Sequence, residues 1–273
     1  MFPRLFELGP LTVYSYGVLL ALSYFIGLYT AVIRARRRGL DGNRIMDLGV
    51  WIILSALVGA KLLLVLVDFS HFRENPRDLF SIARSGGVFY GGLILAVAVG
   101  IWYVRRHRMP VWATGDLAAP GIALGQFVGR IGCLLAGCCY GGHCVRPWAV
   151  TFTNPLAAEL SGTPLNVPLH PVQLYESLAV LGVFFAVLGI ERRPGNFTGR
   201  TFWAYVLLYG LVRFVTEHFR GDPRGQLLAG LSTSQGISLA LVPLAIVMLL
   251  VLSRRAATAA AVAAPARRGR PTP

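Results

Sequence analysis

Apolar runs of about twenty residues recur along the whole chain, and they limit the possible folds more than any other feature. Of the 273 residues, 55% are hydrophobic and 14% are charged, whereas soluble domains carry about 25% charged residues. A helix needs about 20 apolar residues to cross a bilayer. We therefore expect an all-α polytopic membrane protein with about seven transmembrane helices, at Leu11–Ile33, Leu48–Val67, Gly87–Val104, Trp112–Arg130, Leu174–Ile190, Thr201–His218 and Gly236–Leu252.

The arginines between these runs predict the orientation of the chain in the membrane. The net charge is +14, but the arginines gather in alternate connections, which argues for a lipid bilayer and against nucleic acid as the partner. The arginine-rich connections are residues 34–44, 105–108, 192–200 and 254–270. By the positive-inside rule, these connections face the cytoplasm. The N-terminus is then periplasmic and the C-terminus cytoplasmic.

The chain is expected to form one membrane domain followed by a tail. We assign residues 1–255 to a single transmembrane domain. Residues 256–273 are rich in alanine and arginine without an apolar face, which predicts a disordered cytoplasmic segment. The first apolar run is not expected to be a cleavable signal. Only Arg4 precedes it, it is too long for a signal core, and no small-residue cleavage site follows it.

Arg213 lies inside the sixth apolar run, where a charge needs a partner. At about 100° per helical residue, Tyr209, Arg213, Glu217 and Arg220 fall within one stripe. A guanidinium costs at least ~2.5–3.5 kcal/mol at the centre of a membrane helix. Arg213 therefore faces protein, water or an anionic ligand. An ion pair with Glu217, one turn away, is the simplest structural explanation.

A second arginine, Arg130, ends the fourth run, and no acidic residue lies within a turn of it. An external phosphate is therefore the partner that we expect for Arg130. Gly121, Gly125 and Gly129 form a row of small residues that allows close approach between helices. Glycines around Arg130, including Gly132, also let the backbone come near a bulky ligand.

All four cysteines, Cys133, Cys138, Cys139 and Cys144, lie in or next to the long connection that is expected to face outside. Three interpretations stay open. The cysteines can be structural, free or paired in disulfides, which an outward loop permits. With His143 they can bind a metal, although their spacing is not a standard zinc spacing. They can also include a reactive thiol.

Further polar and aromatic residues stand at the boundaries of the expected spans. His170, Gln173, Tyr175 and Glu176 enter the fifth span, where four packed polar side chains suggest more than a helix cap. Tyr90 with Gly91 and Gly92 opens the third span, and Tyr16 lies early in the first. A single aromatic residue at a boundary is commonly an interfacial anchor.

Taken together and in this order, these segments resemble bacterial prolipoprotein diacylglyceryl transferases. The resemblance covers nearly the whole chain and rests on Tyr16-Gly17, Gly91-Gly92-Leu93, Asp116 with Ala119-Pro120, Gly129-Arg130-x-Gly132, His170-Pro171-x-Gln173-Leu174-Tyr175-Glu176, Tyr209-x3-Arg213-x3-Glu217-x2-Arg220 and Ser234-Gln235-x2-Ser238. It implies seven spans with the N-terminus outside, in agreement with the arginine distribution.

The resemblance also implies an activity. Diacylglyceryl would move from phosphatidylglycerol to the lipobox cysteine thiol in the signal peptide of a preprolipoprotein, with release of glycerol phosphate, as a step of lipoprotein biosynthesis. The enzyme would lie in the bacterial inner membrane with its active site toward the periplasm. We expect neither a cofactor nor a metal.

By resemblance, the catalytic residues would be Arg130, Arg213, Glu217 and Tyr90. The two arginines would hold the lipid phosphate and stabilise the departing charge, and Glu217 would orient Arg213. The residues expected to bind substrate are Tyr16, Gly91, Gly92, Gly129, Gly132, His170, Gln173, Tyr175, Glu176, Tyr209 and Arg220.

The sequence departs from the family pattern at several positions. Tyr90 stands where the family usually has a histidine, and tyrosine is a poor proton acceptor at neutral pH. Cys133, Ala136 and Cys138 stand where the family usually has two asparagines and a glutamate. Two alternatives therefore stay open: a lipid-binding paralogue without transferase activity, and a membrane thiol protein with redox or metal chemistry.

Overall fold

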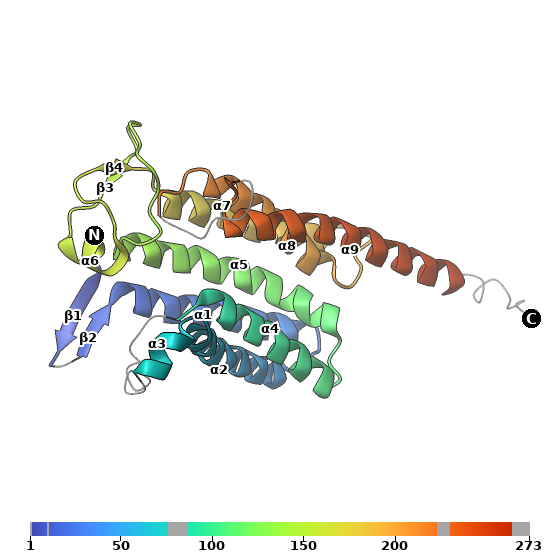
Figure 1. The fold of residues 1–273 in the computed structure, drawn as a ribbon. Helices are drawn as coiled ribbons and strands as arrows, with labels where there is room; N and C mark the ends of the chain where they lie inside the picture. Colours follow the sequence, from blue (N-terminus) through green and yellow to red (C-terminus); the bar gives the residue numbers. More distant parts are fainter. Residues whose placement is uncertain (1, 10, 76–86, 223–229, 264–273) are drawn as a thin grey trace, which may run out of the picture. The chain divides into compact units, whose positions relative to one another are not determined.

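The computed structural model describes residues 2–9, 11–75, 87–222 and 230–263. The described part of the chain is mainly helical (Figure 1), with the elements β1 Arg4–Leu8, β2 Leu11–Tyr14, α1 Ser15–Arg37, α2 Gly42–Val67, α3 Phe69–Glu74, α4 Phe89–Arg106, α5 Val111–Ala136, β3 Val150–Thr151, α6 Pro155–Ser161, β4 Pro168–Leu169, α7 Val172–Arg192, α8 Arg200–Glu217 and α9 Thr233–Ala263.

Six of these helices are long and apolar enough to cross a membrane: α1, α2, α4, α5, α7 and α9. This confirms the all-α polytopic class. Helix α8 lies where the seventh span was expected, but its 18 residues include Arg200, Arg213 and Glu217, so it is too charged to belong to the six. That it spans the membrane, and the orientation of the termini, stay predictions.

The two ends of the helical region differ from the expectation. Residues 11–14 do not begin the first helix but form β2, which pairs with β1 in an antiparallel hairpin. Their mixture of threonine, valine and tyrosine favours a strand.

At the other end, α9 continues to Ala263, so residues 256–263 are helical where a disordered tail was expected. Alanine has the highest helix propensity, which accounts for the extension. Residues 264–273 lie outside the described residues.

The chain divides into two compact units, residues 1–30 with 115–273 and residues 31–114. That residues 1–255 form a single domain stays a prediction. In the second unit, α2 and α4 lie side by side (Figure 1). They cross at Gly59 and Gly91, where a methyl group added at Gly91 would lie 2.3 Å from the carbonyl oxygen of Gly59. The absence of side chains at these two positions therefore sets the distance between the helices.

The core of the first unit lies between α5, α7 and α8. Three buried valines of α7 pack against alanines of the two neighbouring helices. The valines are Val180, Val183 and Val187, and the alanines are Ala119 and Ala123 of α5 and Ala204 of α8. The segment with β3, α6 and β4 lies at one end of this bundle, next to the end of α5 and the start of α7 (Figure 1). It has a small apolar core of its own, formed by Tyr140, Phe152 and Leu169.

The glycine row of α5 packs against the first half of α1. A methyl group at Gly121 would lie 2.3 Å from the carbonyl oxygen of Gly27, and one at Gly125 would lie 2.8 Å from that of Ser23. Both distances are shorter than 3.0 Å, which real Cβ atoms essentially never show, and the neighbouring atoms belong to the backbone. Only glycine therefore fits at the two positions. The close helix approach expected from the small-residue row is confirmed.

Candidate active site

A single carboxylate, that of Glu176 in α7, meets three arginines. It is 1% exposed, and its Oε1 lies 2.7 Å from Nη2 of Arg130 in α5. Its Oε2 lies 3.7 Å from Nη1 of Arg213 and 3.7 Å from Nη1 of Arg220. The sequence predicts an external phosphate as the partner of Arg130, and the structure adds an acidic partner within the protein. Its partner is remote in the sequence, and only the packing of α5 against α7 brings the two together.

Arg213 is held from three helices. Its Nη2 lies 2.5 Å from Oε2 of Glu217, one turn along α8, so the expected i,i+4 ion pair is confirmed. The same nitrogen donates a hydrogen bond to Oγ of Ser234 at the start of α9, at 2.9 Å. Glu176 of α7 lies 3.7 Å from Nη1 as an ion-pair partner without a hydrogen bond, and the arginine side chain is only 8% exposed. These carboxylates offset the charge of Arg213, because an unpaired buried charge is very unfavourable.

Arg220 follows α8 and makes a two-point contact with Asp222, at 2.8 Å and 2.9 Å. Burial opposes the charged form of Arg220, but the hydrogen bonds to Asp222 and Cys139 outweigh it and raise the pKa of Arg220 above its ordinary value. Three arginines (Arg130, Arg213, Arg220) thus face three carboxylates (Glu176, Glu217, Asp222), and their formal charges cancel.

The three arginines differ in access to a ligand. The side chain of Arg130 is 20% exposed, against 8% for Arg213 and 3% for Arg220. A guanidinium carries five N–H donors. Those of Arg130 contact Glu176 and the hydroxyl of Tyr209, which leaves donors for a further acceptor. Arg130 is the member of the cluster that is best placed to receive an anion.

Tyr209 connects Arg130 to the carboxylate. Its hydroxyl donates to Oε1 of Glu176 at 3.4 Å, and its ring stacks on Tyr205, one turn earlier in α8, with 5.8 Å between the ring centroids. Tyr205 in turn donates to Oε1 of Gln126 in α5 at 2.8 Å. Two tyrosines of α8 therefore fix the face of the helix that carries Arg213.

Asp116 in α5 fixes the start of α8. Its two carboxylate oxygens accept hydrogen bonds from the backbone N–H groups of Gly199, at 2.6 Å, and Phe202, at 2.9 Å. The first N–H groups of a helix lack partners within the helix, and a negative charge at that end is favourable. A capping carboxylate usually comes from the adjacent sequence. Here it comes from another helix, and it locks α8 to α5.

At the entry to α7, the rings of His170, Phe219 and Trp148 surround Tyr175. Its hydroxyl accepts a hydrogen bond from Nε1 of Trp148 at 2.7 Å and lies 3.2 Å from Nδ1 of His170. The rings of His170, Tyr175 and Phe219 meet edge to face, with centroids 5.4–6.0 Å apart. His170 and Tyr175 therefore belong to an aromatic cluster beside the arginines.

Backbone hydrogen bonds tie the cysteine-containing loop to this region. The N–H of Gly142 donates to the carbonyl of Phe219 at 2.9 Å, and the N–H of Gly221 donates to that of Tyr140 at 3.1 Å. A methyl group at Gly221 would lie 2.6 Å from the carbonyl oxygen of Gly141. Gln173 adds a side-chain contact, because its Nε2 donates to the carbonyl of Cys138 at 2.8 Å.

None of the four cysteines, all of which lie in the described part of the chain, forms a disulfide. The Sγ atoms of Cys133, Cys138 and Cys139 lie within 4.8 Å of one another, while Cys144 and His143 do not belong to this group. Hydrogen bonds from Cys133 and Cys138, with the charges of Arg220 and Arg130, lower the pKa of the Cys139 thiol. The same hydrogen-bonded cluster raises the pKa of the Cys138 thiol.

Tyr16, Gly129 and Gly132 lie where α5 meets α1. A methyl group at Gly132 would lie 3.1 Å from Cβ of Leu19 and 3.7 Å from the ring of Tyr16. Gly132 thus keeps the two helices close, and Gly129 faces Ser23 with ordinary spacing. The ring of Tyr16 is 40% exposed beside the end of α5 that carries Arg130.

The third-span residues Tyr90, Gly91 and Gly92 belong to the second unit. Gly91 and Gly92 are buried and pack α4 against Gly59 and Ala56 of α2. This contact explains both glycines without a substrate. Tyr90 is half-buried next to Phe89. Its proposed part in catalysis stays a prediction.

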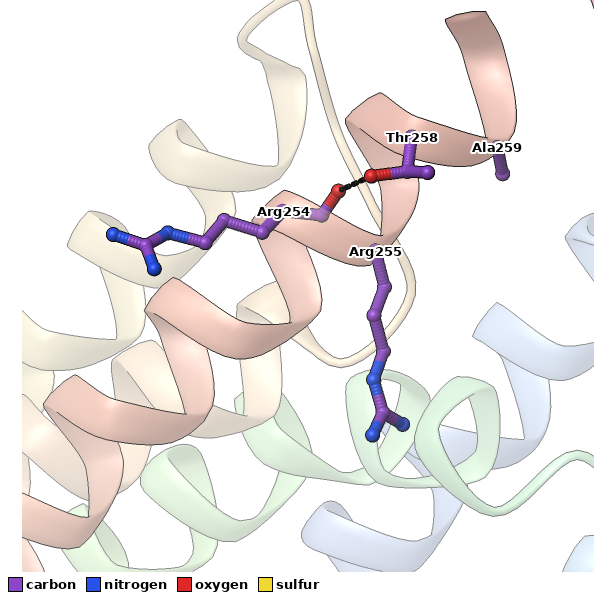
Figure 2. A pocket seen from close by; sticks show the side chains of 4 residues that line it. All are labelled: Arg254, Arg255, Thr258 and Ala259. Carbon is purple, nitrogen blue, oxygen red and sulfur yellow. Dashed lines mark hydrogen bonds between the residues drawn. The ribbon is translucent and has the colours of Figure 1, made fainter. Parts of the chain in front are cut away.

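A separate hollow of about 580 Å³ lies near the C-terminal end of α9, lined by Arg254, Arg255, Thr258 and Ala259. Figure 2 shows that the two arginines project in different directions, and that Thr258 donates to the carbonyl of Arg254, at 3.0 Å. The hollow is roughly 30 Å along the helix from Ser234, at 1.5 Å per residue. It is therefore unrelated to the cluster around Glu176.

Comparison with known proteins supplies the family. The family model described as prolipoprotein diacylglyceryl transferase matches residues 3–251. The chain is 38% identical to the phosphatidylglycerol–prolipoprotein diacylglyceryl transferase of Clostridium tetani, over 88% of this chain and 93% of that protein. The chain belongs to the prolipoprotein diacylglyceryl transferase family. It is also 32% identical to the enzyme of the same name from Bacillus velezensis, over 91% of both chains.

Within the family fold, several residues matter more than the sequence indicated. The sequence predicts Glu176 as a substrate-binding residue, and it does not predict that Asp222 and Ser234 contact the arginines. Asp116 belongs to a motif of the family, but the sequence predicts no role for it. A polar residue within an apolar run was the available signal for Asp116, but the position of its partner could not be deduced without the fold.

Proposed function

We propose that this chain transfers the diacylglyceryl group of phosphatidylglycerol to the lipobox cysteine of preprolipoproteins, at the periplasmic side of the inner membrane. The names of the relatives support the activity and the two substrates. The structural observation that carries the proposal is the partly exposed guanidinium of Arg130, which meets Glu176 and has donors left for a phosphate oxygen.

The reaction forms one bond and breaks one. The thiol sulfur of the acceptor cysteine attacks the carbon of the diacylglycerol group that is joined to the phosphate. The bond between this carbon and the phosphate oxygen breaks. The products are the thioether and glycerol phosphate, and the thiol loses its proton. The phosphate gains negative charge as it leaves, so arginine donors fixed beside it stabilise the transition state more than the bound lipid.

The cluster around Glu176 suits this task because it is assembled before the lipid arrives. Glu217, Glu176 and Ser234 fix Arg213, while Glu176 and Tyr209 fix Arg130. Guanidinium groups held in this way need little rearrangement to bind phosphate, and their planar forks match its oxygens. We assign phosphate binding to Arg130, and positioning to Glu176, Glu217 and Tyr209.

The aromatic cluster and the α1–α5 contact are the proposed substrate-facing surroundings. His170, Tyr175 and Gln173 contribute from the start of α7, and Tyr16 with Gly132 contributes from the contact between α1 and α5. The side chains of Arg213 and Arg220 are too buried to touch the lipid directly. Their charges act on the phosphate at short range through the ion pairs with Glu176.

The test is a transfer assay with purified protein, phosphatidylglycerol vesicles and a lipobox peptide. We expect a thioether-linked diacylglyceryl peptide in mass spectrometry and no product from a peptide with serine in place of the cysteine. If folded protein binds phosphatidylglycerol but yields no product, the chain is a lipid-binding relative and the proposed transfer is wrong.

A further inference from the structure

Three thiols converge beside the proposed phosphate site. Cys133 stands in the last turn of α5, one turn after Arg130, and Cys138 and Cys139 follow that helix directly. Their Sγ atoms lie within 4.8 Å of one another. Zinc bound to thiolates at about 2.3 Å in tetrahedral geometry holds its sulfur ligands about 3.8 Å apart. The three thiols therefore need to move by about 1 Å or less to become ligands of one ion.

The backbone holds these thiols in a folded-back turn. Gly137 has φ of +82° and Cys139 has φ of +58°, both in the left-handed region. That conformation is uncommon for a residue with a side chain and is found at functional sites when the surroundings enforce it. Here the N–H of Cys138 bonds to the carbonyl of Cys133 at 3.1 Å, and Gln173 bonds to the carbonyl of Cys138. The turn is thus fixed from two sides.

The charges around the thiols suit thiolate ligands. Arg220 hydrogen-bonds to the thiol of Cys139, and Arg130 interacts electrostatically with Cys133 and Cys139. Three thiolates around a divalent ion carry a net negative charge, which two neighbouring guanidinium groups stabilise. Cys138 and Cys139 are only half-buried, so one side of the group is accessible.

We propose that Cys133, Cys138 and Cys139 bind a zinc ion whose fourth coordination position receives the thiol of the acceptor cysteine. Catalytic zinc sites keep one position open in this way, and soft thiolate ligands favour zinc over hard cations. The second part of this inference rests on the proposed function. The first part, the metal site, does not.

Zinc bound here would prepare the acceptor for the transfer reaction. A thiol that coordinates zinc loses its proton, and the thiolate is the nucleophilic form. The proton leaves to solvent on binding. The zinc-bound sulfur then forms the bond to the glycerol carbon, the bond from that carbon to the phosphate oxygen breaks, and glycerol phosphate leaves beside Arg130. No oxidant or reductant is needed.

The metal site is tested by titrating chelator-treated, reduced full-length protein with Zn²⁺ and measuring bound zinc by elemental analysis. We expect one zinc per chain. Cys139→Ser should weaken binding at least about tenfold, since even the loss of an outer-shell partner has effects of that size. Cys144→Ala is the matched control, because this buried cysteine lies outside the group of three, and it should bind zinc like the unchanged chain. Equal zinc binding by Cys139→Ser, or no stoichiometric binding by reduced protein, would overturn the site.

The acceptor position is tested with Co²⁺ in place of zinc, because thiolate-to-cobalt absorption reports the number of thiolate ligands. Adding a lipobox peptide should increase this absorption, and the same peptide with serine should not. An unchanged spectrum with the cysteine peptide would overturn the fourth-ligand assignment. Transfer by protein shown to be metal-free would refute the zinc role but leave the proposed function intact. Zinc binding without transfer under any condition would instead refute the proposed function.

Discussion

Arg130 and Glu176 stand on different helices, yet Nη2 of the arginine lies 2.7 Å from Oε1 of the glutamate. The carboxylate is 1% exposed and also faces Arg213 and Arg220, at 3.7 Å each. One buried acid therefore sets the positions of three cations. The arrangement leaves only Arg130 partly open, which links the structural role of Glu176 to the proposed binding of phosphate.

Replacing Glu176 by glutamine should destabilise the protein. The amide keeps the shape but removes the charge that faces three guanidinium groups, and breaking a buried ion pair typically costs about 3–5 kcal/mol. We expect a lower thermal unfolding temperature in detergent and a loss of transfer. Glu159→Gln, on an exposed position of α6, is the control and should leave both unchanged. Unaltered unfolding of Glu176→Gln would show that the arginines do not depend on this carboxylate.

Arg130 should tolerate neither alanine nor lysine in the transfer reaction. Lysine keeps the charge but loses the planar fork, so Arg130→Lys should bind phosphatidylglycerol more weakly while keeping the fold. Arg130→Ala should lose about 2–4 kcal/mol of transition-state stabilisation, as for a removed oxyanion donor. Steady-state kinetics with Arg254→Ala as the control would measure both effects. Wild-type binding and turnover in Arg130→Ala would make the phosphate assignment wrong.

Asp116→Ala should loosen α8. The change leaves the N–H groups of Gly199 and Phe202 without the carboxylate that accepts their hydrogen bonds, and each unsatisfied buried donor costs about 1–3 kcal/mol. We expect a lower unfolding temperature and slower transfer, because α8 carries Arg213. Asp116→Asn keeps one carbonyl oxygen and should have a smaller effect. The order of the two variants, measured by thermal unfolding, tests the cap.

Replacing a glycine by alanine should have different effects on stability in α5 and in α7. A methyl group at Gly121 would lie 2.3 Å from a backbone oxygen of α1, so Gly121→Ala should destabilise the first unit by about 1–3 kcal/mol through overpacking. Gly182 in α7 has nothing within 4 Å of its added methyl group. Gly182→Ala should therefore be neutral, or stabilising by roughly 0.5–1 kcal/mol. Equal unfolding temperatures for the two variants would contradict the helix contact.

In metal-depleted protein, Cys139 should lose its proton at a lower pH than the adjacent Cys138. The pKa of Cys139 is lowered by its hydrogen bonds and by Arg220, so its thiolate persists below the usual pH range, whereas the raised pKa of Cys138 keeps that thiol protonated. Iodoacetamide should therefore alkylate Cys139 at acidic pH and spare Cys138. Arg220→Gln should move the Cys139 midpoint upward. Peptide mapping by mass spectrometry measures both, and preferential alkylation of Cys138 at low pH would reverse the assignment.

The fold class and several local contacts could be predicted from the sequence because they depend on short-range patterns. Apolar runs of bilayer length predicted the helices, and the i,i+4 spacing of Arg213 and Glu217 predicted their ion pair. The row Gly121, Gly125 and Gly129 predicted close helix approach. The strand at residues 11–14 was missed because four apolar and β-favouring residues continue directly into a helix of similar hydropathy.

Only the tertiary structure decided the contacts between residues that are far apart in the chain. Nothing local to Arg130 indicates Glu176, and nothing local to Gly199 indicates Asp116, because the packing of α5 against α7 and α8 creates both pairs. The convergence of Cys133, Cys138 and Cys139 likewise depends on a left-handed turn that their unusual spacing did not reveal. The sequence by itself determined the helices and the kinds of chemical group they carry. A charge buried in an apolar bundle must find an opposite charge, and only the packed fold determines which residue provides it.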